Sequence, residues 1–491
     1  MDRRISPAEA IRGYATTHQS TAIKMALAVV LVLYTFLITH GNFNLFNETW
    51  MGLAFNSMVV HLSHGQFDVD PDKILFEGFV HDGKTYSYYG VFFALIRLPI
   101  LLFERLQKYN FTLISCLMAD LIVVYCQAKL VLKCFKSVER PSVGWLFIAA
   151  MALTLFSGPQ VYLLRPSIYQ EVAYWALALT YLFVYVLLDI VLFERQATTG
   201  RLFSLSLLAG LALLARVATG IGLYVTVVAA LVTLVRRSGT PRSSARYWVP
   251  LLTLALFAAA TGFVNYMRWG HPFEFMDPHN DLSYSEASNP GAIARIDRYG
   301  TFNFIRLGYG LLYYFLPLWM IRQSDGTLLF SEFHHRTIDM VELPPSSFFI
   351  TDPIWLALAI YMLVCLVRSW SSVKSPLAVT VLGFCLAIPG AGMLLYMAYA
   401  VRYRVDFYPA IMFMAFLGLH RFLRRDPKAG LPGRSLPWVW PLAAMSVLSA
   451  PVLLLLYYAS PFGGNVDGFA RDGWIRGYMQ HISAAVAQGA R

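Results

Sequence analysis

The sequence has little charge for a chain of its length. Only 14% of its 491 residues are Asp, Glu, Lys or Arg, whereas 57% are hydrophobic. This balance argues against a soluble domain, which presents a charged surface to water. Apolar stretches of roughly 17–25 residues recur, and each could cross about 30 Å of hydrocarbon as a helix. Because lipid offers backbone groups no hydrogen-bond partner, we expect an all-α polytopic membrane helix bundle of about 11 transmembrane helices.

Motifs for metals, nucleotides and disulfides are also missing from the sequence. The five cysteines all lie in or beside apolar segments and form no CxxC pair, so we predict neither a disulfide framework nor a zinc site. The histidines form no HExxH pattern, and we assign no metal site. No glycine loop for a nucleotide is present. The sequence therefore requires no cofactor, although carboxylates in the first polar loop leave a divalent cation possible.

The net charge of +11 is spread over short basic clusters beside hydrophobic segments. Such clusters are typical of membrane topology signals, and we expect no nucleic-acid partner. The N-terminus and the stretches "VRRSGTPRSSARY" and "HRFLRRDPKAGLPGR" are basic, which predicts a cytoplasmic location for all three. The chain, 1–491, would then form a single integral membrane domain. Its expected outer segments are residues 41–90 with a short helix over 49–64, residues 267–352, the short turn 399–404, and the C-terminal tail 459–491.

Two apolar segments conflict with this topology. Residues 89–105 and 111–132 both look able to span the membrane, yet the basic loop that follows them allows only one net crossing. One of the two should therefore be tilted, re-entrant or interfacial. A third apolar stretch, residues 302–320, is rich in tyrosine and has polar flanks, which predicts a helix lying on the outer surface.

The first outer loop carries three aspartates within five residues, Asp68, Asp70 and Asp72. In an extended segment alternate residues point the same way, so the three could face one site. Carboxylates there could act as a general base or bind a divalent cation. The alternative is an acidic loop that is simply solvated.

Arginines on the expected outer side oppose the usual inward bias. The stretch "VRYRVDFYP" contains Arg402, Tyr403, Arg404 and Asp406. A guanidinium forks well onto phosphate oxygens, which suits a lipid head group or a leaving phosphate. The alternative is that Arg402 and Asp406, four residues apart, pair on a helix.

Further charged residues lie near or within apolar segments, namely Arg97, Arg165, Glu171 and Arg216. An ionisable group in the membrane is costly and usually faces a cavity or a partner. A structural ion pair or an arginine that extends to the interface would explain each of them alone.

The order of these features resembles the GT-C class of membrane glycosyltransferases, in particular bacterial members related to the protein mannosyltransferase and aminoarabinose transferase families. The matching stretches are "HGQFDVDP", "DGKTYSYYGVFFALIRLP", "IYQEVAYW", "LLARVATG", "NYMRWGHPFEF", "ELPPSSFF" and "VRYRVDFYP". The likeness in organisation covers most of the chain, and each motif is short.

The resemblance implies inverting sugar transfer from a polyprenyl-phosphate donor to an envelope glycan, lipid or protein. A first-loop aspartate, Asp68 or Asp70, would be the base, and Arg402 or Arg404 would lie near the donor phosphate. The other residues that it implies for substrate binding are Tyr403, Tyr86, Tyr88, Glu171, Arg165, Arg216 and His271. It also implies the bacterial inner membrane, where the loop charges predict a cytoplasmic N-terminus and a periplasmic C-terminus.

Two other functions fit parts of the sequence. A transporter or flippase for a lipid-linked sugar would place its charges near the bilayer midplane and often contains an internal repeat. This sequence instead concentrates polar residues in asymmetric outer loops and shows no evident repeat, which favours the enzyme. A non-catalytic assembly protein is the third possibility, and it would tolerate substitutions in the acidic loop.

Overall fold

The computed structural model describes residues 27–39, 41–136, 166–193, 195–238, 245–284, 291–316, 330–341, 347–424 and 441–449, with residues 21, 24, 25 and 154. This part of the chain is an all-α bundle with two small two-stranded sheets. Five of its helices are long and apolar enough to cross a membrane: α5 (Thr112–Lys136), α7 (Ile168–Val191), α9 (Val217–Ser238), α10 (Ala245–Trp269) and α16 (Pro376–Leu395). Three shorter apolar helices accompany them: Leu27–Ile38, α8 (Thr199–Ala215) and α15 (Pro353–Arg368).

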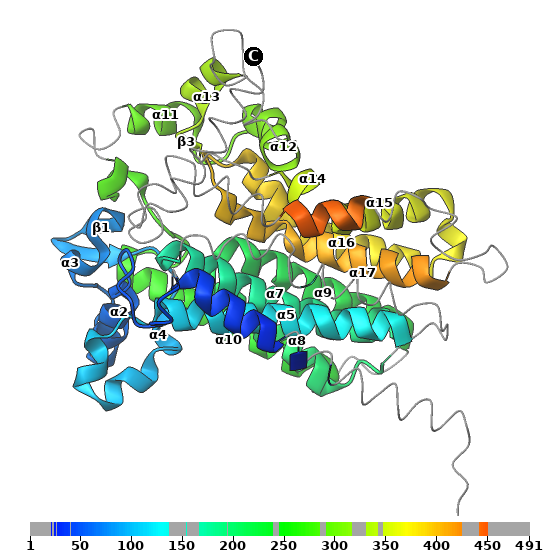
Figure 1. The fold of residues 1–491 in the computed structure, drawn as a ribbon. Helices are drawn as coiled ribbons and strands as arrows, with labels where there is room; N and C mark the ends of the chain where they lie inside the picture. The colour runs from blue at the N-terminus through cyan, green and yellow to red at the C-terminus, as the bar shows by residue number, and fades with distance from the viewer. Residues whose placement is uncertain are drawn as a thin grey trace, which may run out of the picture.

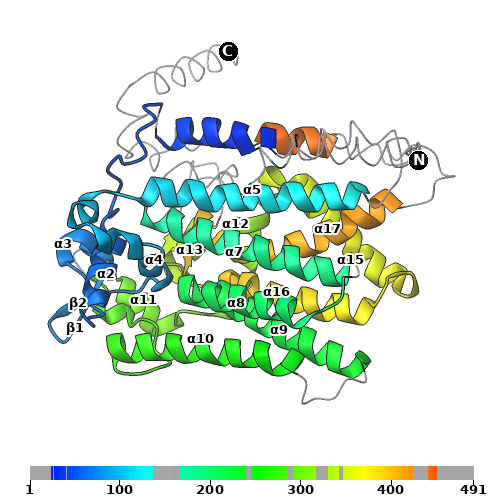
Figure 2. The ribbon, with the colours of Figure 1, turned by 90° about the horizontal axis from the view of Figure 1, so that it is seen from below.

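The long helices lie side by side, and the non-helical and short elements gather mainly at one end of the bundle (Figures 1 and 2). Helices α5 and α7 run in the same direction, since Ser115 bonds to Trp175 near their starts and Gln127 bonds to Tyr181 further along. Helix α17 (Tyr408–Arg424) packs against α15. We call the end where α5, α7, α9, α15 and α17 begin the loop end, and the opposite end the basic end.

The first polar segment folds onto the loop end as short elements. These are α2 (Ala54–Ser63), α3 (Pro71–Ile74), the 3-10 turn η1 (Leu75–Glu77), and the antiparallel strands β1 (Gly78–His81) and β2 (Lys84–Ser87). Asp82 and Gly83 make the hairpin turn with φ of +48° and +73°, as expected for an Asp-Gly pair. Gly90 then passes so close to the end of α8 that a Cβ atom would lie 1.8 Å from the Leu214 carbonyl oxygen. A side chain at this position would push the preceding stretch, Tyr86–Tyr89, off the bundle.

The remaining short elements at the loop end come from later in the chain. They are η6 (Pro278–Asn280), η7 (Leu282–Tyr284), α11 (Ala292–Tyr299), η8 (Phe304–Arg306), α12 (Leu307–Phe315), α13 (Ser331–Thr337), α14 (Phe348–Thr351) and η11 (Val401–Asp406). Strand β3 (Met340–Val341) pairs in parallel with β4 (Ala398–Tyr399). Arg306 is 1% exposed and donates to the carbonyls of Thr337 at 2.8 Å and Leu395 at 3.3 Å. It thereby joins α12 and α13 to the C-terminal end of α16.

Residues 89–105 do not form a membrane-spanning helix. They fold as α4 (Phe92–Leu95) and the 3-10 turns η2 (Leu98–Leu102) and η3 (Glu104–Lys108), whereas residues 111–132 lie in the long helix α5. The conflict in the predicted topology is resolved, because only α5 crosses between the loop end and the basic end. Residues 89–105 are therefore the one of the two segments that does not cross, as the predicted topology required. Buried Arg97, which bonds to side chains of α2 and α7, holds this stretch against the bundle.

Other boundaries differ from the sequence predictions in smaller ways. The short helix expected over residues 49–64 begins at Ala54 and ends at Ser63. The stretch 302–320 forms η8 and then α12, whose Tyr309, Tyr313 and Tyr314 are buried. Residues 317–320, the N-terminal stretch 1–20 and the tail 459–491 lie outside the described residues, so the count of about 11 crossings remains a prediction.

Candidate active site

Asp68 and Asp70 lie on either side of one imidazole, that of His61 near the end of α2. The Oδ2 atom of Asp68 is 3.5 Å from Nδ1 of His61, and the Oδ1 atom of Asp70 is 3.2 Å from Nε2. Ser57, one turn earlier on α2, donates its hydroxyl to Oδ2 of Asp70 at 2.9 Å and accepts the backbone N–H of the same residue. Two carboxylates are thus oriented by groups from a single helix face.

The two carboxylates differ in their access to water. The side chain of Asp70 is 48% exposed, whereas that of Asp68 is 19% exposed, and its Oδ1 atom is buried without a hydrogen-bond partner in the described chain. Asp72 turns away from both and pairs with Lys73 at 2.6 Å, with a 70% exposed side chain. The prediction that all three aspartates face one site is therefore wrong for Asp72, because Pro71 starts the short helix α3 between them.

An aromatic wall and a buried arginine lie next to the carboxylate pair. The rings of Phe79 and Tyr86 both contact Trp269, at centroid distances of 5.8 and 5.6 Å. Burial, followed by the nearby charge of Asp68, raises the pKa of the Tyr86 hydroxyl. Arg268 is 3% exposed and donates to the Tyr89 carbonyl at 2.9 Å. No carboxylate in the described part of the chain pairs with it, so Arg268 is a buried cation available to an anion.

A second cluster of cations and tyrosines joins four chain segments at the loop end. The Tyr169 hydroxyl, at the start of α7, donates to Glu77 of the first loop. The Arg402 guanidinium lies over the ring of Tyr169 at 4.5 Å and over that of Tyr403 at 5.1 Å. Tyr88 lies in the same surroundings, and its burial raises the pKa of its hydroxyl well above the ordinary value, so the group remains a proton donor.

Arg216, between α8 and α9, completes this second cluster. It forks onto the fully buried Asp406, with Nη2 2.6 Å from Oδ2 and Nε 3.2 Å from Oδ1, while Thr219 donates to Oδ1 at 2.7 Å. Its guanidinium also lies 5.2 Å from the centre of the Tyr403 ring. The alternative pairing of Arg402 with Asp406 is therefore wrong. Asp406 instead bonds to Thr219 of α9 and to Arg216 just before that helix, whereas Arg402 stacks on Tyr169 and Tyr403.

Several residues predicted for substrate binding lie outside these two clusters, and some of them form buried ion pairs within the fold. Arg404 and Asp352 are both fully buried and 2.5 Å apart, so this arginine ties η11 to α15. Glu171 is fully buried and forms a two-point ion pair with Arg97. His271 is exposed and contacts the ring of Phe273, two residues along the chain. Arg165 lies outside the described residues.

Some residues of the site carry no clear signal in the sequence. His61 and Ser57 sit four residues apart on α2, and Glu77 and Tyr169 meet across 92 positions of the chain. Arg268 lies within the motif "NYMRWGHPFEF", and its position in an apolar helix could have identified it. No group of three or more metal-ligating side chains that could hold an ion occurs among the residues that the structure describes.

Asp281 lies where η7 meets β1, and its backbone forms an isolated bridge to Phe79. Its carboxylate accepts the Ser283 N–H at 2.8 Å and the hydroxyl at 2.7 Å, and burial raises its pKa to about 6. The folded form therefore holds its proton to a higher pH than the unfolded chain does. Stability is lost as the pH rises from about 4 to about 6, because the folded state must then bury a charge.

We expect Asp281→Asn to stabilise the protein relative to wild type, because the amide keeps an acceptor and cannot ionise. The gain in the thermal midpoint of the detergent-solubilised protein should increase from pH 4.5 to pH 6.5 and stay constant above. A gain that is the same at every pH, or a loss that grows with pH, would contradict this assignment.

Comparisons with known proteins add a structural likeness. No family model and no curated protein matches the chain. Among solved structures it is similar to the crystal structure of the Archaeoglobus fulgidus oligosaccharyltransferase, which is tethered by a disulfide bond to an acceptor peptide containing the NVT sequon. The two are 14% identical with a TM-score of 0.41, over 88% of this chain and 54% of the archaeal one. The chain therefore spans about half the length of that protein.

Proposed function

We propose that this protein is a membrane glycosyltransferase that moves a sugar from a polyprenyl-phosphate donor to an acceptor in the cell envelope. The observation that carries the proposal is the carboxylate pair around His61, which lies at the same end of the bundle as buried Arg268 and Arg402, with Tyr86 close to the charges of both Asp68 and Arg268. A base for the acceptor and cations for a phosphate are the two requirements of this transfer. The order of motifs in the sequence supports the same reaction class.

In the proposed reaction, Asp70 accepts the proton of the acceptor hydroxyl. Its exposure of 48% allows an acceptor to reach it, and Ser57 and His61 hold its oxygens in place. The acceptor oxygen forms a bond to the anomeric carbon as the bond between that carbon and the phosphate oxygen breaks. The phosphate leaves with the electron pair, and a single displacement inverts the anomeric centre. Asp68 acts by orienting the His61 ring.

Arg402 and Arg268 would stabilise the departing phosphate. Arg402 is held by stacking on Tyr169 and Tyr403, and a guanidinium stacked on rings can still fork onto phosphate oxygens. Arg268 is already desolvated, so its electrostatic attraction for an anion beside it is stronger than it would be in water. Tyr86 and Tyr88 supply amphipathic rings where the sugar would meet the lipid tail. The reaction so described needs no nucleotide or organic cofactor.

The same proposal places the protein in a bacterial inner membrane, with the loop end facing the periplasm. Arg195, Arg236 and Arg368 lie at the basic end, which suits the cytoplasmic side. The donor would enter from the bilayer, and the acceptor, a glycan, lipid or protein, would enter from the periplasm.

One observation favours transport of a lipid-linked sugar instead. Asp120, in the first half of α5, is fully buried, and neither of its carboxylate oxygens has a hydrogen-bond partner in the described chain. An ionisable group within a membrane helix is a frequent feature of transporters. The enzyme proposal gives Asp120 no part in the chemistry, so the two functions make different predictions for this residue.

The test uses purified protein in vesicles that contain a radiolabelled polyprenyl-phosphate sugar and membrane-extracted acceptors. We expect label to become covalently attached to acceptor only when the protein is present, and the Asp120→Asn variant to transfer at the wild-type rate. Protein-dependent movement of labelled lipid across the bilayer without covalent transfer, abolished by Asp120→Asn, would replace the enzyme by a transporter.

A further inference from the structure

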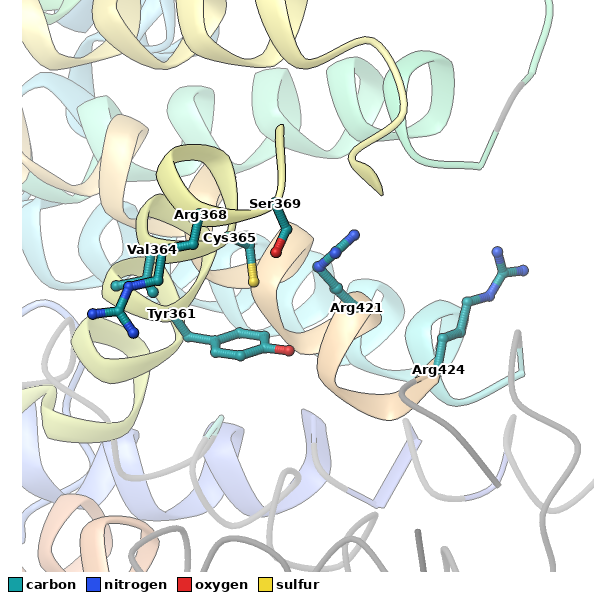
Figure 3. Close-up of a pocket in the computed structure, with 7 residues that line it drawn as sticks. All are labelled: Tyr361, Val364, Cys365, Arg368, Ser369, Arg421 and Arg424. Atoms are coloured by element: carbon teal, nitrogen blue, oxygen red, sulfur yellow. The ribbon is translucent and has the colours of Figure 1, made fainter. Parts of the chain in front are cut away.

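A pocket of about 530 Å³ lies at the basic end, far from the candidate active site. It is formed where α15 and α17 end side by side, and Figure 3 shows its walls. Its lining residues in the described chain are Tyr361, Val364, Cys365, Arg368, Ser369, Arg421 and Arg424. Its volume falls within the range of small-molecule sites, so it is large enough for a head group.

The charged side chains that line the pocket are all positive. Three of its seven described lining residues are arginines, and none is an acid. Arg421 and Arg424 are three residues apart and thus share a face of α17, where like charges repel. The helix macrodipole stabilises cations at a helix C-terminus, which accounts for one arginine at the C-terminal end of α15 and one at that of α17. The macrodipole does not account for two arginines on one face of α17, Arg421 and Arg424, beside Arg368 of the neighbouring helix α15.

The three arginines differ in how they are held. Arg421 donates from Nη1 to the Ser372 carbonyl at 3.0 Å and from Nη2 to the Ser372 hydroxyl at 2.5 Å, in the turn η10 (Trp370–Ser372). Arg368 and Arg424 are exposed, and no described carboxylate pairs with either. In Figure 3 they lie on opposite sides of the Tyr361 ring, which extends from α15 toward α17. The three arginines therefore line one pocket, with Arg421 fixed to η10 and the other two exposed.

The flank of the pocket is apolar and exposed. Val364 and Val367 of α15 are 42% and 84% exposed, and Trp370 just beyond the helix is 45% exposed. Exposed valines at the end of a membrane helix suit contact with lipid tails, and tryptophan is enriched at the level of the head groups. A ligand in this pocket could thus place its charge among the arginines and its chains along α15.

We propose that this pocket binds the phosphate of an anionic phospholipid head group from the membrane leaflet at the basic end. Guanidinium groups fork onto phosphate oxygens, and basic pockets between membrane helices on the cytoplasmic side bind anionic head groups. A free phosphate offers the same oxygens without the acyl chains, so the source of the phosphate is tested separately. This site is independent of the sugar-transfer proposal.

The test compares wild type with Arg368→Gln/Arg424→Gln, which leaves the bonds of Arg421 to η10 intact. A matched control, Arg195→Gln/Arg236→Gln, removes two other exposed arginines at the basic end. Each protein in neutral detergent is titrated with phosphatidylglycerol, phosphatidylcholine or inorganic phosphate. Native mass spectrometry counts the bound lipid, and the thermal midpoint reports stabilisation by the ligand.

We expect phosphatidylglycerol to bind wild type and the control alike, and the pocket variant at least tenfold more weakly, as loss of a charge-assisted bond predicts. Phosphatidylcholine and inorganic phosphate should give much smaller shifts. Equal weakening in the pocket variant and the control would mean that general surface charge binds the lipid, and would overturn the proposal. An equal effect of inorganic phosphate would overturn the lipid as its source.

Discussion

Asp70→Asn is expected to lower the rate of sugar transfer by about 10²–10⁴-fold, the usual contribution of a general base. The amide keeps the size of the side chain and can still accept a hydrogen bond from Ser57, so the loop should hold its position. What it loses is the ability to take the acceptor's proton. The rate should fall with little change in donor binding, because Asp70 acts on the acceptor.

The matched control for this variant is Asp72→Asn, two residues along the same loop. Asp72 has a 70% exposed side chain and pairs with neighbouring Lys73, so its variant should transfer at the wild-type rate. Transfer is measured in vesicles at equal protein content, with donor binding measured separately. If Asp68→Asn abolishes transfer while Asp70→Asn does not, Asp68 is the base. Full activity in the Asp68→Asn/Asp70→Asn double variant would contradict the proposed mechanism.

Glu171→Gln is expected to destabilise the protein by about 3–5 kcal/mol, because it leaves a buried guanidinium without its carboxylate. Arg97 is 3% exposed and Glu171 is fully buried, and Nη1 and Nη2 of the arginine lie 2.7 and 2.8 Å from the two carboxylate oxygens. The guanidinium also donates to Asn56 at 3.1 Å. This network anchors residues 89–105 to α2 and α7.

The double variant Arg97→Met/Glu171→Met should recover most of this loss, since it removes both buried charges together. Asn56 would still lose a donor, so recovery should be incomplete. Asp189→Asn is the control at the basic end, where the pair of Asp189 with Lys133 is partly exposed and a smaller effect is expected. The measurement is the free energy of unfolding from denaturant titration in detergent.

The same variant decides between two roles for Glu171. A structural role predicts loss of stability that the double variant repairs. A substrate-binding role, which the sequence resemblance implies, predicts normal stability with weaker substrate binding. An unchanged free energy of unfolding in Glu171→Gln would therefore contradict the structural role drawn from its burial.

The candidate site could be predicted from the sequence only in part. The three aspartates within five residues indicated Asp68 and Asp70, and the arginines on the expected outer side indicated Arg402. The partners of these residues were not predictable. His61 has no distinctive neighbours on α2, and Glu77 is one of several acids in its loop.

The sequence by itself determined that this chain is a helical membrane bundle and which end of it is basic. A backbone that spans hydrocarbon must form its hydrogen bonds internally, so the length and composition of the apolar segments suffice to predict helices. Only the tertiary structure decided that residues 89–105 stay at the loop end and which acid each arginine takes. Arg97 meets Glu171 across 74 positions, and Arg216 meets Asp406 across 190. Such pairings depend on how helices pack, and no local pattern of residues encodes them.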